Sequence, residues 1–305
     1  MKLYVGITDW DWFQFLRAHS AVEMNFWRPR SITGFNVIKP GELFLFKSKY
    51  PENKIIGGAY LVRHTVLPLN LAWEVFSEAN GFATFEEFQT KISSIRRDGE
   101  RNPKIGCTVL TDPFYLSDAE SWPAPKDWKA SSQTGKSYDV SEGEGARLFE
   151  QAKHAMLSTH GINENLLKEA APRYGAGQLI KPRLGQGGFR IVVLEGYERK
   201  CSITGEKTLP VLEAAHIQPY AAMGPHDLSN GLLLRSDWHT LFDNGYVTVT
   251  NDLKIEVSRK IKEEFSNGRD YYAYHGSSLK VLPKEISQRP AKAFLEWHQT
   301  ERYLS

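Results

Sequence analysis

Residues 201–245 read CSITGEKTLPVLEAAHIQPYAAMGPHDLSNGLLLRSDWHTLFDNG, and this stretch says most about the fold and chemistry of the chain. The apolar runs in VLEAAHI and NGLLLR are typical of two short strands, and SDWHTLFDNG is typical of a short helix that ends at Gly245. The predicted order is strand, loop, strand, helix. It places His216 at the end of the first strand, Asn230 at the start of the second and His239 on the helix.

These three residue types suit phosphodiester hydrolysis, which needs a base to activate water and a cation to stabilise charge on the phosphate. A neutral imidazole at His216 can take a proton near physiological pH. Asn230 has amide donors and a carbonyl acceptor, so it can tie the loop to the strand and orient His216. His239 can offer a nitrogen to a divalent cation, and Asp243, on the same helical face, can add a carboxylate oxygen.

The surrounding motifs QGGFR, CSITG, LEAAHIQPY, NGLLL and DWHTLFDNG occur in the order seen in HNH endonucleases. Over about residues 180–250 the chain resembles this family, whose active site is a ββα-metal fold. The resemblance implies that His216 is the general base, Asn230 the structural asparagine and His239 a metal ligand. It also implies a bound divalent metal, Mg²⁺ or Mn²⁺.

The sequence departs from the family pattern at two places. Many HNH proteins have an acidic metal ligand directly before the first histidine, where this chain has Ala215. We expect the replacement ligand to be Asp243 or, ranked second, Glu213. Many members also hold the hairpin with Cys-x-x-Cys pairs, but here Cys201 is followed by Thr204 at the partner position. No structural zinc is therefore expected.

Candidate DNA contacts precede and follow the first strand. The stretch RLGQGGFR, residues 183–190, is either a loop whose backbone grips phosphates or a turn before a strand at residues 189–197. His226 lies in the loop between the two hairpin strands and is expected to be exposed. The predicted DNA-binding residues are Arg183, Gln186, Arg190 and Arg235.

The rest of the chain indicates a second domain. Its 305 residues suggest two domains, and 41% hydrophobic residues with 24% charged ones exclude a largely disordered chain. We expect an α+β protein with a recognition domain at 1–120, a Ser- and Pro-rich linker at 121–145 and an HNH domain at 146–305. No transmembrane segment or signal peptide is evident, which favours the cytoplasm. The net charge of +2 argues weakly against DNA binding, although residues 168–200 are locally basic.

The N-terminal region has no catalytic signature. Residues 41–50, GELFLFKSKY, and 53–67, NKIIGGAYLVRHTVL, predict strands. Entered by Lys-Pro-Gly, they resemble the small β-barrels of the PUA superfamily, including EVE domains, some of which bind modified bases by flipping them. That resemblance implies a PUA-like β-barrel with helices. The dense aromatics are either core or a pocket that stacks a flipped base, for which the candidates are Trp10, Trp12 and Trp27.

The combined reading is a metal-dependent HNH endonuclease that cuts double-stranded DNA, as a modification-dependent restriction enzyme reading modified cytosine. One HNH site cuts one strand, so cutting both strands predicts a homodimer. Two alternatives stay open. One is a nickase or effector nuclease controlled by a ligand or partner, and the other is a DNA-binding module whose HNH site is degraded.

Overall fold

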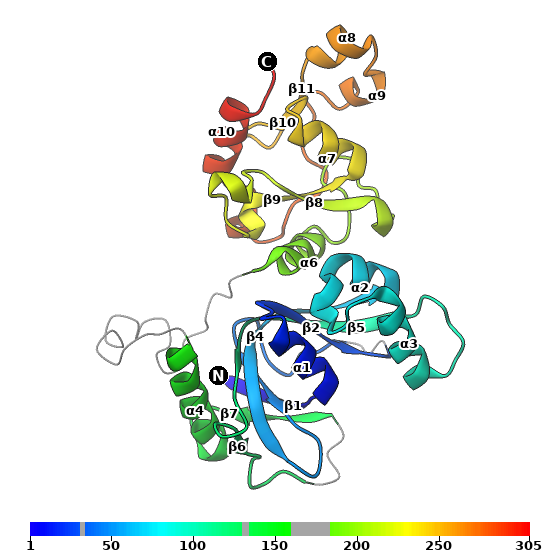
Figure 1. Ribbon diagram of the computed structural model, residues 1–305. Coiled ribbons are helices and arrows are strands. Elements are labelled where there is room, and N and C mark those ends of the chain that lie inside the picture. The colour runs from blue at the N-terminus through cyan, green and yellow to red at the C-terminus, as the bar shows by residue number, and fades with distance from the viewer. Residues whose placement is uncertain (31–33, 130–133, 160–183) are drawn as a thin grey trace. The chain divides into compact units, whose positions relative to one another are not determined.

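The computed structural model describes residues 1–30, 34–129, 134–159 and 184–305 (Figure 1), and of 157–159 only the backbone. The described chain forms two compact units, Met1–Gly188 and Phe189–Ser305. Both mix helices and strands, as expected for the α+β class. None of the described helices is long and apolar enough to cross a membrane.

The first unit is built on a seven-stranded sheet, within the described residues, in the order β2-β5-β4-β3-β1-β7, with β6 pairing to β4. Only the β1–β3 pairing is parallel among the pairings recorded for this sheet. The strands are β1 (Lys2–Ile7), β2 (Glu23–Arg28), β3 (Leu43–Lys47), β4 (Lys54–Pro68), β5 (Lys104–Tyr115), β6 (Trp122–Pro123) and β7 (Gly135–Asp139).

The central strands are buried on both faces, which explains the unbroken apolar run in β3. Because side chains alternate along a strand, Phe44 and Phe46 join an aromatic cluster on one face, while Leu43 and Leu45 join an aliphatic cluster on the other. Burying each such side chain stabilises the fold by roughly 1.5–3 kcal/mol. The sequence pattern therefore predicted β3 and β4 well.

Helices cover the sheet and begin at capping residues where the sequence supplies them. Asp9 accepts the Trp12 N–H at the start of α1, and Thr84 accepts the Glu87 N–H at the start of α3. Helix α1 belongs to the aromatic side, and α4 contributes Leu148 to the aliphatic cluster. The helices are α1 (Trp10–Ala18), α2 (Leu69–Phe76), η1 (Ser77–Asn80), α3 (Phe85–Arg96) and α4 (Gly143–Thr159).

The expected linker at 121–145 is instead part of the first unit. β7 pairs antiparallel with β1 over five residues, and α4 begins before the expected boundary. The sequence did not reveal β7 because GKSYD lacks an apolar period and only Tyr138 of the strand is buried. A strand at the margin of a sheet can be this polar because one side pairs with no neighbour.

The predicted strand at 189–197 is also wrong, because this segment lies in α6 (Gln186–Gly196) and the turn after it. The buried side chains Phe189, Val193, Leu194 and Tyr197 recur at helical spacing. The β-branched run Ile-Val-Val suggested a strand, but packing along one helical face overrides that propensity.

The second unit contains the predicted strand–strand–helix order. β8 (Leu212–His216) and β9 (Gly231–Arg235) form an antiparallel pair, and α7 (Ser236–Asp243) follows directly. A second hairpin pairs β10 (Val247–Val249) with β11 (Ile255–Val257). The remaining elements are η3 (Leu209–Val211), η4 (Tyr220–Ala222), η5 (Leu228–Asn230), α8 (Lys260–Phe265), α9 (Arg269–Tyr272), η6 (Ile286–Gln288) and α10 (Lys292–Glu301).

Candidate active site

The hairpin register fixes His216 at the last position of β8, opposite Gly231 on β9. The His216 ring stacks on Phe189 of α6, with centroids 3.7 Å apart and an interplanar angle of 12°. A side chain at Gly231 would bring a Cβ within 2.5 Å of Val193, so glycine allows α6 to approach the hairpin. Burial, together with the nearby His226 and His239, lowers the pKa of His216 to about 4. His216 is therefore neutral at physiological pH and can accept a proton.

Asn230 is fully buried and clamps the loop between the two strands. Its Oδ1 accepts the Gln218 N–H, and its Nδ2 donates to the carbonyl oxygens of Gln218 and Pro225, all at 2.9 Å. These bonds hold the loop backbone, as expected from the sequence, but none of the three reaches the His216 ring, which Asn230 was also expected to orient. Any effect of Asn230 on the His216 ring therefore passes through the loop.

His226 was missed by the sequence reasoning, which treated it as an exposed loop residue. Its Nδ1 lies 2.9 Å from His216 Nε2, and its ring stacks on Tyr220 with centroids 4.6 Å apart. The Asn230 bond to Pro225, the residue before His226, turns this part of the loop back toward β8. Sequence spacing gave no signal for this contact because it depends on how the loop folds.

His239 lies on α7 between two carboxylates. Its Nδ1 is 2.6 Å from Glu213 Oε2 of β8, and its Nε2 is 3.2 Å from Asp243 Oδ2, one helical turn later. The structure thus brings together the three residues predicted to bind metal. Ala215 itself is fully buried.

The donor set fits one hard divalent cation only in part. An imidazole nitrogen with carboxylate oxygens suits such a cation. The two ring nitrogens point away from each other, however, so only one of the two carboxylates can share an ion with His239. Among the described residues, no group of three or more His, Cys, Asp or Glu side chains is arranged to hold a metal. The choice between Asp243 and Glu213 stays a prediction.

The predicted DNA-binding residues have different surroundings. Arg183 lies outside the described residues, and Gln186 is exposed at the first position of α6. Arg190 is half-buried on α6, not in a glycine-rich loop. Arg235 binds Asp237 through two hydrogen bonds of 2.6 and 2.7 Å, which raise its pKa. Its guanidinium is therefore already paired within the second unit.

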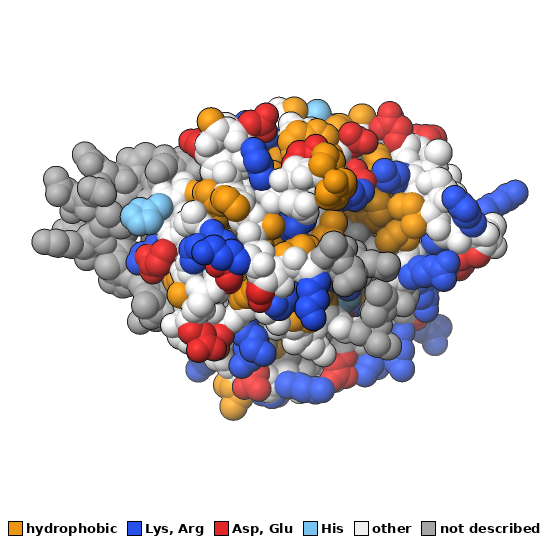
Figure 2. Space-filling model, turned by 90° about the horizontal axis from the view of Figure 1, so that it is seen from below, with side chains coloured by type: hydrophobic (Ala, Val, Ile, Leu, Met, Phe, Trp, Pro, Cys, Tyr) orange, Lys and Arg blue, Asp and Glu red, His pale blue; other side chains and the backbone are white. Residues whose placement is uncertain are grey.

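The three candidate tryptophans do not meet in one pocket. Trp12 lies in the aromatic core with 4% exposure, and Trp27 is half-buried with its Nε1 donating to the Asn80 carbonyl. Trp10 is 45% exposed and lines a cavity of about 580 Å³ together with Lys49, Tyr50 and other residues of the β3–β4 turn. Figure 2 shows hydrophobic side chains gathered among lysines and arginines on one face of the molecule.

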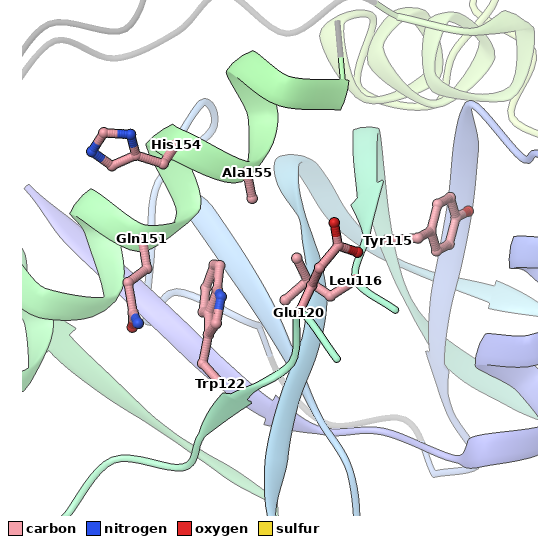
Figure 3. Close-up of a pocket in the computed structure, with 7 residues that line it drawn as sticks. All are labelled: Tyr115, Leu116, Glu120, Trp122, Gln151, His154 and Ala155. Atoms are coloured by element: carbon pink, nitrogen blue, oxygen red, sulfur yellow. The ribbon is translucent and has the colours of Figure 1, made fainter. Parts of the chain in front are cut away.

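A second cavity, of about 480 Å³, lies between α4 and the chain that leads from β5 to β6. Figure 3 shows Gln151, His154 and Ala155 on α4, with Trp122 and Glu120 rising from the opposite wall. None of these residues was predicted from the sequence as part of a site. The Glu120 carboxylate accepts hydrogen bonds from the Ser117 amide and hydroxyl.

Parts of the chain are similar to known proteins. The family described as HNH endonuclease matches residues 201–250. A search of curated proteins found no match. Among solved structures, an ASCH protein mutant from Zymomonas mobilis is similar at 16% identity, covering 49% of this chain and 97% of that one, with a TM-score of 0.33.

Two restriction endonucleases are also similar in structure. The modification-dependent TagI restriction endonuclease matches at 14% identity, covering 86% of this chain and 61% of that chain, with a TM-score of 0.30. The Type IV phosphorothioation-dependent restriction endonuclease ScoMcrA matches at 15% identity, covering 75% and 44%, with a TM-score of 0.19. The family match coincides with β8, β9 and α7, so this chain carries an HNH endonuclease domain at residues 201–250.

Proposed function

We propose that the protein is a divalent-metal-dependent HNH endonuclease that hydrolyses phosphodiester bonds in double-stranded DNA. One observation carries the proposal: a neutral His216 ends β8 and His239 stands on α7, inside the segment that matches HNH endonucleases. A base beside a candidate cation ligand is the arrangement that water-mediated phosphodiester hydrolysis requires.

In the proposed reaction His216 takes a proton from water while the water oxygen attacks phosphorus, and the bond from phosphorus to the leaving 3′ oxygen breaks. A divalent cation, when bound, stabilises the charge on the phosphate and the leaving oxygen. His239 and one of its two carboxylate neighbours are the residues that would hold it. Asn230 keeps the loop beside the base closed.

The alternative of a degraded HNH site rests on Ala215, which cannot bind metal. Glu213 argues against it, because its carboxylate reaches His239 from the same strand, two residues earlier. A carboxylate therefore lies beside His239 although the position directly before His216 is an alanine.

We further propose that the first unit selects the target by taking in a modified cytosine flipped out of the duplex. Trp10 supports this because it is exposed at a cavity of about 580 Å³, within the size range of small-ligand sites. Lys49 and Lys54 also line this cavity and can contact the phosphates beside a flipped base. Trp12 and Trp27 support the fold around it.

The test is a digestion matrix. Plasmids containing cytosine, 5-methylcytosine or 5-hydroxymethylcytosine are incubated with and without Mg²⁺ or Mn²⁺, using the wild type, His216→Ala and, as a control, His19→Ala at an exposed histidine. We expect metal-dependent cutting that His216→Ala abolishes and His19→Ala leaves intact. Full cleavage by His216→Ala would contradict the assignment of His216 as the base of the HNH reaction. Equal cutting of every plasmid would contradict only the reading of modified cytosine.

The same digests test the assembly. Because one HNH site cuts one strand, we propose that two copies act together on a duplex. Linear product that forms without a lag after nicking, and a dimer by analytical ultracentrifugation on DNA, are expected. Nicked circles as the only product would favour the alternative of a nickase.

A further inference from the structure

We propose that His226 is a positioning residue for the HNH reaction, one that holds His216 in the tautomer with its proton on Nε2 and leaves Nδ1 free to act as the base. This inference rests on the proposed nuclease function. It concerns a loop histidine that the His–Asn–His pattern does not include.

The two imidazoles are held so that only these nitrogens meet. His216 Nε2 and His226 Nδ1 lie 2.9 Å apart, the distance of a hydrogen bond. Each ring is fixed from a different side, because His216 stacks on Phe189 and His226 stacks on Tyr220. Stacking limits rotation of both rings, so His216 Nε2 and His226 Nδ1 stay facing each other.

The loop that carries His226 is closed tightly. The Nδ2 group of the buried Asn230 bonds the carbonyl of Pro225, the residue before His226. A Cβ at Gly224 would lie 1.9 Å from the Gln218 carbonyl oxygen, so the chain passes itself too closely there for any side chain. The structural asparagine thereby acts on the base through His226.

A hydrogen bond between two neutral imidazoles contains one proton, and its position decides what His216 can do. If His226 donates, the remaining proton of His216 sits on Nδ1, and no nitrogen of His216 is left to take a proton from water. If His216 donates from Nε2, its Nδ1 is a free acceptor. When Nδ1 then takes the water proton, the charged His216 ring keeps its hydrogen bond to His226. This bond stabilises the imidazolium.

The first experiment reads the tautomer without any cleavage. The full-length protein, labelled with ¹⁵N-histidine and free of metal and DNA, is studied by long-range ¹H–¹⁵N correlation, with His216 assigned from His216→Ala. We expect a protonated Nε2 and an unprotonated Nδ1. A His216 ring protonated on Nδ1 would overturn the proposal, whether or not the protein cuts DNA.

The second experiment tests whether His226 acts as a hydrogen-bond acceptor or only packs against its neighbours. His226→Phe keeps a ring to stack on Tyr220 but has no acceptor, whereas His226→Asn places an oxygen close to the position of Nδ1. We expect kcat to fall at least about 100-fold in His226→Phe with the KM for DNA unchanged, and to recover to within about tenfold of wild type in His226→Asn. Wild-type kcat in His226→Phe would overturn the proposal.

The outcomes distinguish this inference from the proposed function. If His216→Ala itself cuts DNA at the wild-type rate, the proposed role of His216 as the base fails, while the tautomer measurement still decides the His226–His216 bond. If His226→Phe does not fold, as judged by circular dichroism, the comparison of His226→Asn with wild type and the ¹⁵N spectrum remain decisive.

Discussion

At the scale of single residues, the two sides of the His239 ring have different surroundings. The Nδ1–Glu213 contact of 2.6 Å is short and joins α7 to β8, whereas Asp243 approaches Nε2 at 3.2 Å from the same helix. Metal-binding histidines commonly donate the other ring N–H to a carboxylate, which orients the ring. Glu213 fits that orienting role, which leaves Nε2 and Asp243 for the cation.

This argument predicts unequal effects of two isosteric substitutions. Asp243→Asn should raise the Mg²⁺ or Mn²⁺ concentration for half-maximal cleavage about 10–100-fold, because it removes a charged ligand. Glu213→Gln keeps an oxygen that can accept from Nδ1, so its metal requirement should change less. Metal titrations of plasmid cleavage measure both. A larger shift in Glu213→Gln would reverse the assignment.

Residues at this site could be predicted from the sequence when a short regular element positions them, but not when the path of a loop does. His216, Asn230 and His239 were predicted from a pattern carried by a short hairpin and helix, and the structure contains those elements at the expected places, whereas the roles of the three residues stay predictions. His226 was missed because its contact depends on the path of the loop. Trp12 was offered as a pocket residue because aromatic density alone cannot distinguish a core from a binding surface, and it lies in the core.

At the scale of elements, α10 is joined to α7 by one buried histidine. His298 stacks on Phe242 with centroids 3.7 Å apart, accepts a hydrogen bond from Thr248 at Nδ1 and donates from Nε2 to the Phe242 carbonyl. Both ring nitrogens are thus satisfied in the neutral form. Burial lowers the pKa of His298 to about 4.

This burial predicts loss of stability in acid. The pKa of His298 is lower in the folded protein than the value of about 6.5 in an unfolded chain, so between these values the unfolded chain binds more protons. The contribution of neutral His298 to the free energy of unfolding is complete above about pH 6.5. It declines by up to about 3 kcal/mol as the pH falls to about 4. Urea unfolding at a series of pH values should show a shallower decline in His298→Gln than in wild type. The exposed His19→Gln serves as the control, and an identical decline in all three proteins would refute the role of His298.

Two elements show why the sequence foretold the fold incompletely. The α6 segment was predicted as a strand because its Ile-Val-Val run has high β propensity, while the helical spacing of Phe189, Val193 and Tyr197 decided the structure. β7 was predicted as linker because its polarity hides its pairing with β1. Both errors arose where tertiary partners, not local pattern, determine the element.

At the scale of the whole molecule, the proposed function divides recognition from cutting between the two units. The HNH domain belongs entirely to the unit Phe189–Ser305, and the cavity at Trp10 belongs entirely to Met1–Gly188. The net charge of +2 gives the protein little general attraction for a polyanion. Under the proposed function, selective cutting would then depend on what the first unit binds.

This division predicts opposite effects of one substitution in each unit. Trp10→Ala removes a largely exposed ring, so the protein should stay folded, but losing base stacking worth about 1–3 kcal/mol should weaken binding of modified duplex about 5–150-fold. Its cleavage of modified plasmid should fall toward the rate on unmodified plasmid, and Trp10→Phe should restore part of the preference. His216→Ala should bind modified duplex like wild type, by fluorescence anisotropy, without cutting it.

Trp122→Ala, at the other cavity, distinguishes the two candidate pockets. If it abolishes the preference while Trp10→Ala does not, the base is read between α4 and the β5–β6 connection instead.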